Sequence, residues 1–167
     1  LKNNKNKYQK FELRSTKLSC IISLPQDYLF KSGDAVLKKG AYNALSPLFK
    51  KILQIPEHKK DLLTVEGHTD NVPIRSKKFP SNWELSSARA TSIATMLIKR
   101  LNYPEKSLSI NGYADTRPKA KYKDSSGSNL TGQALKEARM INRRVEIVLS
   151  TPPKSLEEST LLFGEKK

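Results

Sequence analysis

The segment from residue 81 to 101 limits the possible folds most, because it predicts a long helix with one apolar face. It opens with Ser81-Asn-Trp-Glu84, the Ser-x-x-Glu form of a capping box, in which both side chains satisfy free amides at a helix start. At about 3.6 residues per turn, the apolar side chains share one half of the helix surface: Leu85, Ala90, Ile93, Ala94, Met96, Leu97 and Leu101. Such a face has to pack against another layer.

Short apolar segments predict the strands of that layer, at residues 18–24, 62–67, 108–113 and 144–149. A further helix is predicted from Leu37 to Ile52, where apolar residues recur at helical spacing. Pro47 lies inside it, so the helix is either kinked or restarts with Ser46 as its cap. A short helix is predicted over residues 133–140.

The predicted order is strand, helix, strand, helix, strand, short helix, strand. This order favours an α/β (α+β) two-layer sandwich, in which a mixed four-stranded sheet carries helices on one face, with right-handed crossovers between parallel strands. The chain has 167 residues, the size of one ordinary domain with additional residues at its ends. We predict a basic lead-in or linker over residues 1–17, one domain over 18–150 and a tail over 151–167.

The formal net charge of +15 would suit nucleic acid, an anionic membrane or another polyanion. The excess is dispersed: residues 1–17 carry six basic and one acidic side chain, residues 18–150 carry 22 and 12, and residues 151–167 carry three of each. Basic and aromatic residues also do not interleave as they do in proteins that stack single-stranded bases. Nucleic acid is therefore not the predicted partner.

No apolar run approaches the roughly 18 residues that a membrane-spanning helix needs. The chain starts at Leu1 with no charged and apolar leader, so we expect a processed protein or a segment of a longer one. Cys20 is the single cysteine, which excludes an intramolecular disulfide and fits a small buried thiol.

Arg89 lies within the apolar half of the helix that follows Ser81, and a buried charge without a partner is costly. The partner is either structural, from Asp70 or Glu66, or a ligand carboxylate that accepts two parallel bonds from the guanidinium. Alternatively, the long side chain reaches solvent at the edge of the apolar stripe. Spacing alone does not decide between these three.

Asp70 follows the end of a predicted strand, where loops often display functional groups, although Asp in a turn also serves local hydrogen bonding. His68, two residues earlier, is a candidate metal ligand. However, the other histidine is His58, Cys20 is distant, and no second ligand stands at metal spacing. No metal site is predicted.

The sequence predicts neither an enzyme nor a cofactor. No nucleophile, base and orienting residue occur together, and there is no Gly-rich phosphate loop. Two carboxylates for glycan hydrolysis could always be chosen from 16 acidic residues, which makes that hypothesis weak.

Three separated motifs, in order, resemble the signature of OmpA-like peptidoglycan-binding domains. The central one spans residues 65–74 and 79–90, and the opening and closing ones are Asp27-Tyr-Leu-Phe-Lys-Ser-Gly33 and Asn142-Arg-Arg-Val-Glu-Ile147. The resemblance covers roughly Leu18 to Leu149. The sequence Phe79-Pro-Ser-Asn-Trp83 most resembles the MotB branch of the family, the stator subunits of the flagellar motor.

In this family the Asp of the Gly-x-Thr-Asp motif and the Arg of the Leu-Ser-x-x-Arg-Ala motif bind diaminopimelate of the peptide stem, which implies Asp70 and Arg89 here. One end of diaminopimelate carries an ammonium and a carboxylate, so an anion beside a guanidinium recognises it as a zwitterion. By the same resemblance, Asn82 at the helix start and Arg143 from the final strand would line the pocket. Asn82 could instead belong to the helix cap, and Arg144 should point to the opposite face.

The resemblance implies a non-enzymatic periplasmic domain that anchors an envelope complex to peptidoglycan, with the motor stator as the first candidate. Outer-membrane proteins, lipoproteins and secretion-system subunits with the same domain are alternatives. Stator members have an N-terminal transmembrane helix, so a membrane partner would be reached through a segment absent from this chain. Family members often work as dimers, which implies a homodimer. A basic nucleic-acid or polyanion-binding module is the alternative from another class, and a wall hydrolase is the third.

Overall fold

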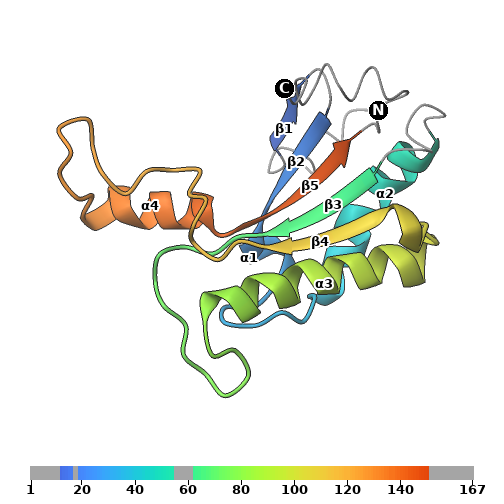
Figure 1. The fold of residues 1–167 in the computed structure, drawn as a ribbon, viewed down its shortest axis with the longest axis horizontal. Coiled ribbons are helices and arrows are strands. Elements are labelled where there is room, and N and C mark those ends of the chain that lie inside the picture. Colours follow the sequence, from blue (N-terminus) through green and yellow to red (C-terminus); the bar gives the residue numbers. More distant parts are fainter. Residues whose placement is uncertain (1–11, 17–18, 55–61, 151–167) are drawn as a thin grey trace, which may run out of the picture.

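The computed structural model describes residues 12–16, 19–54 and 62–150, which form one sheet with helices (Figure 1). The strands are β1 (Glu12–Ser15), β2 (Ser19–Pro25), β3 (Leu62–Gly67), β4 (Leu108–Gly112) and β5 (Arg144–Ser150). The helices are α1 (Gln26–Leu29), α2 (Lys39–Gln54), α3 (Asn82–Leu101) and α4 (Gly132–Asn142), with a 3₁₀ turn at Glu105–Ser107.

The sheet is mixed, with strand order β1-β2-β5-β3-β4. Only β3 and β4 run parallel among the described strands, and α3 connects them, as a crossover between parallel strands requires. β5 lies between β2 and β3 and is antiparallel to both. The last strand in the sequence is therefore central, which brings the segment before β5 beside the ends of β2 and β3.

Helices α2 and α3 cover one face of this sheet. Alternate residues of the central strands point to that face, as the period of two in a strand requires. The buried cluster between the layers includes Leu24, Val65, Val145 and Ile147 from the sheet, Leu45 and Phe49 from α2, and Ile93 and Leu97 from α3. Helix α4 lies apart from this layer and projects beyond the end of the strands (Figure 1). The predicted two-layer α+β architecture is confirmed for β2 to β5 with α2 and α3.

Four details differ from the sequence prediction. The sheet has five strands rather than four, because β1 forms within the segment assigned to the lead-in and pairs with β2. A one-turn helix, α1, follows Pro25, where only a stop was predicted. Helix α2 begins at Lys39 rather than Leu37 and continues through Pro47, so the alternative of a restart at Ser46 is wrong. Helix α4 begins at Gly132 and runs to Asn142, two residues beyond the predicted end.

The start of α3 is the element that the sequence predicted most closely. The Ser81 side chain accepts a hydrogen bond from the amide of Trp83, and the Glu84 carboxylate accepts one from the Ser81 amide at 2.8 Å. The predicted capping box is confirmed. At the other end, Asn102 adopts a left-handed conformation with φ of 52° and closes the helix.

Two glycines bring α3 close to the strands that it connects. A Cβ at Gly67, the last residue of β3, would lie 2.1 Å from the backbone oxygen of Ser86. A Cβ at Gly112, the last residue of β4, would lie 2.1 Å from Oγ of Ser87 and 2.8 Å from its backbone nitrogen. Only glycine fits at these positions, so both set the distance between the helix and the strand ends.

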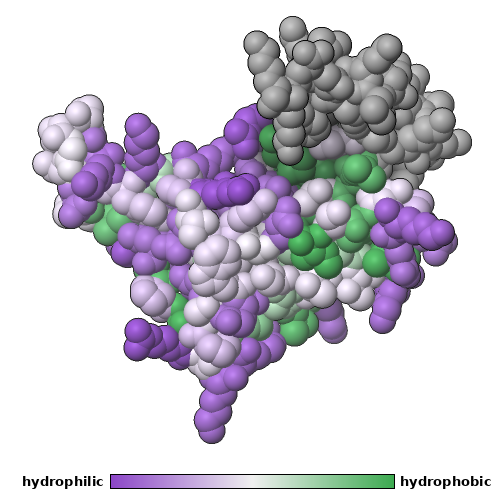
Figure 2. Space-filling model, viewed as in Figure 1, coloured by the Kyte–Doolittle hydropathy of each residue, from purple (hydrophilic) through white to green (hydrophobic). Residues whose placement is uncertain are grey.

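No helix in the described part of the chain is long and apolar enough to cross a membrane. Several predictions concern residues outside that part: most of the lead-in, the C-terminal tail over 151–167, Leu18 and His58. On the face shown in Figure 2 the surface around α4 is mostly hydrophilic, and larger hydrophobic patches lie over the sheet.

Candidate binding cavity

One cavity brings together all four residues that the resemblance assigned to the binding site. Its volume is about 570 Å³, and Asp70, Asn82, Arg89 and Arg143 all line it. It lies where the turn after β2, the loop after β3, the first turns of α3 and the residue before β5 meet. A second cavity of about 380 Å³, beside Met140 and Ile141, contains none of the four.

Asp70 is held rigidly at the cavity wall. Its Oδ1 accepts the amide of Val72 at 3.0 Å, and its Oδ2 accepts Nη1 of Arg143 at 2.7 Å. The next residue, Asn71, is fixed by two further bonds, from its amide to the hydroxyl of Tyr122 and from Nε of Arg139 to its side-chain oxygen. The loop that carries Asp70 is therefore tied to the segment containing α4.

Asn82 positions the same loop from the side of α3. Its side-chain oxygen accepts the amide of Ile74 at 3.2 Å, and its Nδ2 donates to the backbone oxygens of Asp70 at 3.3 Å and Val72 at 3.1 Å. Ser81 is the N-cap, so Asn82 is not the capping residue that the sequence left as an alternative. Asn82 therefore positions the backbone of the loop that carries Asp70.

Arg143 lies at the cavity, but its predicted location in the final strand is wrong. It is the residue between α4 and β5, with φ of −72° and ψ of 88°. Besides Asp70, it contacts Asp27 with 3.5 Å between Nη2 and Oδ2. Arg144, the first residue of β5, turns away and donates from Nε to Glu146 at 3.0 Å. The prediction that these two arginines point in opposite directions is confirmed.

Arg89 is the most deeply buried charged side chain in the cavity wall, with 2% of its surface exposed. Its Nε donates to the backbone oxygen of Asp34 at 2.8 Å, its Nη1 donates to Oε1 of Gln26, and its guanidinium carbon lies 5.5 Å from the centre of the Phe30 ring. Among the residues described, it forms no ion pair with Asp70 or Glu66, the two structural partners considered from sequence. Its Nη2 has no hydrogen-bond partner in the same part of the chain.

Burial lowers the pKa of Arg89 to about 10, while the negative charges of Asp27 and Asp34 act in the opposite direction. The guanidinium is still charged at neutral pH. A charged, buried nitrogen without a partner costs free energy, and that cost is removed when an anion binds it. The arrangement is therefore suited to a ligand carboxylate.

Sequence reasoning missed Gln26 and Asp27 as cavity residues. Both belong to the one-turn helix α1, and Asp27 opens the first of the three motifs, which is the signal that could have identified it. With Asp27 included, two carboxylates and two guanidiniums line the cavity, and their formal charges cancel. The site is thus locally neutral in a chain of net charge +15.

Replacing Asn82 by alanine removes three hydrogen bonds from the loop of Asp70, each of which contributes about 1 kcal/mol. We expect Asn82→Ala to lower the free energy of unfolding by about 1 to 3 kcal/mol and to weaken ligand binding by roughly tenfold. Urea unfolding measures the first effect, and calorimetric titration with a diaminopimelate-containing stem peptide measures the second. Asn43→Ala, at an exposed position of α2, serves as the control. Unchanged binding by folded Asn82→Ala would contradict the positioning role.

Comparison with known proteins places these residues in a family. The model of the OmpA family matches residues 29–131, more than half of the chain and a span that contains Asp70, Asn82 and Arg89. This chain therefore belongs to the OmpA family.

Two relatives come from Bacillus subtilis (strain 168). The uncharacterized protein YtxE is 37% identical over 129 residues, covering 77% of this chain and 47% of that protein. Motility protein B is 32% identical over 151 residues, covering 89% of this chain and 51% of that protein. The chain thus spans about half the length of these relatives.

Solved structures share the fold. The periplasmic domain of Helicobacter pylori MotB (residues 90–256) superimposes with a TM-score of 0.75 at 25% identity, covering 95% of this chain and 90% of that one. The cell wall anchor of the T6SS from Pseudomonas aeruginosa superimposes with a TM-score of 0.71 at 27% identity, covering 88% and 92%. The predicted OmpA/MotB-like fold is confirmed.

Proposed function

We propose that this domain binds peptidoglycan without a covalent bond, by holding the zwitterionic end of diaminopimelate in the stem peptide between Asp70 and Arg89. The ligand carboxylate accepts from Arg89, and the ligand ammonium donates to Asp70. The observation that carries this proposal is the buried Nη2 of Arg89, which has no partner among the described residues and belongs to a side chain that lines the same cavity as Asp70.

The charge balance of the cavity supports a zwitterion over a polyanion. A polyanion site would present an excess of basic side chains, but here Asp27 and Asp70 offset Arg89 and Arg143. A ligand with one charge of each sign can satisfy Arg89 and Asp70 together and leaves the balance unchanged.

Arg143 and Asn82 act mainly on Asp70. Arg143 fixes the direction of the Asp70 carboxylate, and a carboxylate that already accepts from Val72 and Arg143 retains lone pairs for an ammonium. Asn82 holds the backbone on either side of Asp70. The site is therefore organised before the ligand arrives, which lowers the entropic cost of binding.

The biological role that we propose is a periplasmic anchor that holds an envelope complex to the cell wall. Relatives named Motility protein B make the flagellar motor stator the first candidate, with a membrane tether preceding this chain and a homodimer as the working form. A wall anchor of a secretion system is the second candidate, because one structural neighbour is described as the wall anchor of the T6SS. We propose binding alone, without catalysis and without nucleic acid as a partner.

Incubation with purified peptidoglycan sacculi tests this proposal. We expect the chain to sediment with the sacculi, to be displaced by free diaminopimelate, and to release no soluble glycan or peptide fragments. Sedimentation should change little between about 50 and 200 mM salt, because a buried pair is screened much less than surface charge. Release of fragments would instead identify a wall hydrolase. Failure to sediment, together with DNA binding that falls steeply over the same salt range, would identify a polyanion-binding module.

A further inference from the structure

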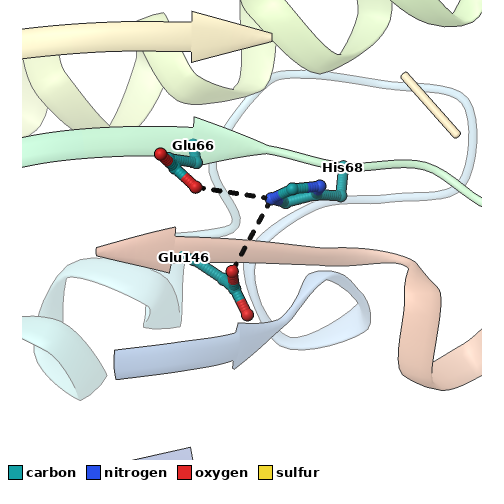
Figure 3. Close-up of side chains that lie close together, drawn as sticks. All are labelled: Glu66, His68 and Glu146. Atoms are coloured by element: carbon teal, nitrogen blue, oxygen red, sulfur yellow. Dashed lines mark ion pairs between the residues drawn. The ribbon is translucent and has the colours of Figure 1, made fainter. Parts of the chain in front are cut away.

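A second cluster of ligand-type side chains lies on the sheet face opposite α2 and α3. Glu66 of β3, Glu146 of β5 and His68, just after β3, converge there (Figure 3). Nε2 of His68 lies 3.8 Å from Oε2 of Glu66 and 3.8 Å from Oε2 of Glu146. The three ligand atoms lie within 4.8 Å of one another. The expectation that no second ligand accompanies His68 is wrong for Glu66, which precedes it by two residues, while Glu146 arrives only through the pairing of β3 with β5.

The two carboxylates of this cluster lie opposite each other, an arrangement that favours a cation between them. Glu66 and Glu146 are direct partners in the antiparallel pairing of β3 and β5, and like charges directly opposite each other are destabilising. Glu146 is neutralised on one side, because its Oε1 accepts Nη2 of Arg14 at 3.0 Å and Nε of Arg144 at 3.0 Å. Its Oε2 and that of Glu66 are the two oxygens that face His68.

The ring of His68 is buried, with 2% of the side chain exposed, and its two nitrogens lack hydrogen bonds within the described residues. Its backbone amide donates to the oxygen of Arg144 at 3.0 Å, and its ring lies 5.3 Å from that of Tyr113. A distance of 3.8 Å is too long for an N–H···O hydrogen bond, so an imidazolium bridging both carboxylates directly would lie closer to at least one of them.

We propose that Glu66, His68 and Glu146 bind a divalent transition-metal ion of the zinc class. One imidazole nitrogen and two carboxylate oxygens match its ligand preference, with bonds of about 2.0 to 2.2 Å and a fourth position left for water. In a tetrahedral site with bonds of about 2.1 Å the ligand atoms lie roughly 3.4 Å apart. The three atoms here lie within 4.8 Å of one another, so side-chain movements of up to about 1.4 Å would complete the site. Mg²⁺ and Ca²⁺ are disfavoured because they take oxygen ligands almost exclusively.

The groups around the three ligands orient the two carboxylates through hydrogen bonds. Arg14, Arg144 and the hydroxyl of Ser23 hold Oε1 of Glu146 and leave Oε2 for the ion. The hydroxyl of Tyr113 donates to Oε1 of Glu66 at 3.5 Å. The two arginines reduce the affinity for a cation, while the orienting bonds to both carboxylates raise it. The ion would join the end of β3 to β5 and so fix the strand that leads to Asp70.

Titration of metal-free protein with Zn²⁺ against a chromophoric chelator tests this site, with Co²⁺ absorption as a second probe. Both use a Cys20→Ser background, so that the single thiol contributes no ligand. We expect one Zn²⁺ per chain, and a Tm higher by about 5 to 10 °C at a free Zn²⁺ concentration near 100 times Kd. Tyr113→Phe, which removes a hydrogen bond to a ligand but no ligand, should weaken Zn²⁺ binding by about tenfold. His68→Gln and Glu66→Gln each remove a ligand and should weaken Zn²⁺ binding by more than about 100-fold.

Glu137→Gln, an exposed acid on α4, and His58→Gln, at the other histidine, are matched controls and should bind as the parent does. Titration of the parent protein tests the proposal whether or not a variant folds. If the parent protein binds neither Zn²⁺ nor Co²⁺ at one ion per chain, the proposal is contradicted. So does equal binding by folded His68→Gln and Glu66→Gln. A Tm that does not rise with Zn²⁺ would also contradict it. None of these readouts depends on peptidoglycan binding.

Discussion

Replacing Arg89 by alanine is expected to weaken the binding of a diaminopimelate-containing stem peptide by about a hundredfold or more. Truncating one partner of a buried, hydrogen-bonded charge pair costs about 2 to 5 kcal/mol, and 2.7 kcal/mol corresponds to about a hundredfold. Arg89→Lys keeps the charge but loses the planar fork, so its affinity should fall between those of the wild type and the alanine variant. Calorimetric titration with the soluble peptide measures all three.

The matched control for this experiment is Arg100→Ala. Arg100 lies on the same helix but is exposed, with its guanidinium carbon 5.9 Å from the centre of the Tyr42 ring. Both substitutions lower the net charge by one, so a general electrostatic attraction would weaken equally in the two variants. Equal loss in both, recovered at low salt, would contradict a specific role for Arg89. Circular dichroism must show that Arg89→Ala is folded, because Gln26 and the oxygen of Asp34 lose their partner.

Replacing Gly67 by alanine is expected to lower the free energy of unfolding by about 3 kcal/mol or more. The added Cβ would lie 2.1 Å from the oxygen and 2.8 Å from the carbonyl carbon of Ser86, and backbone atoms of α3 cannot move away without shifting the helix. For a chain of this length the Tm should fall by roughly 6 to 12 °C. Because Asp70 follows β3 and Arg89 lies on α3, the cavity should also widen and bind its ligand less tightly.

Gly40→Ala is the matched control for this substitution. Gly40 lies in α2, and a Cβ there would meet nothing within 4 Å. In a helix, alanine is preferred over glycine by about 1 kcal/mol, so this variant should be as stable as the wild type or slightly more stable. Urea unfolding of the two variants side by side measures the contrast. A Gly67→Ala protein as stable as Gly40→Ala would show that the close approach of α3 to β3 is not required.

The fold could be predicted from the sequence where the local pattern and the tertiary packing agree. Helix α3 has both a capping box and an apolar stripe, and β3 and β5 have strand character with clear ends. The pattern failed at β1, whose four residues are all exposed and give no apolar signal. It was undecided at Pro47, because the proline removes one helical hydrogen bond and only the buried neighbours determine whether the helix continues.

The candidate site could be predicted in part. The motif resemblance supplied Asp70, Asn82, Arg89 and Arg143, and the structure brings them to one cavity. The partners of Arg89 could not be predicted, because Gln26 and the backbone oxygen of Asp34 come from irregular segments placed only by the fold. The same holds for Glu146 beside His68, since nothing in the sequence sets the register between β3 and β5.

Co-sedimentation with purified sacculi of the wild type beside Asp70→Asn and Arg89→Ala tests the central claim most directly. Asp70→Asn keeps the size of the side chain and removes the charge that would meet the ligand ammonium. The account predicts that the wild type sediments with the sacculi and that both variants, folded by circular dichroism, stay in solution. If both folded variants sediment as the wild type does, Asp70 and Arg89 are structural residues and the cavity is not the peptidoglycan-binding site.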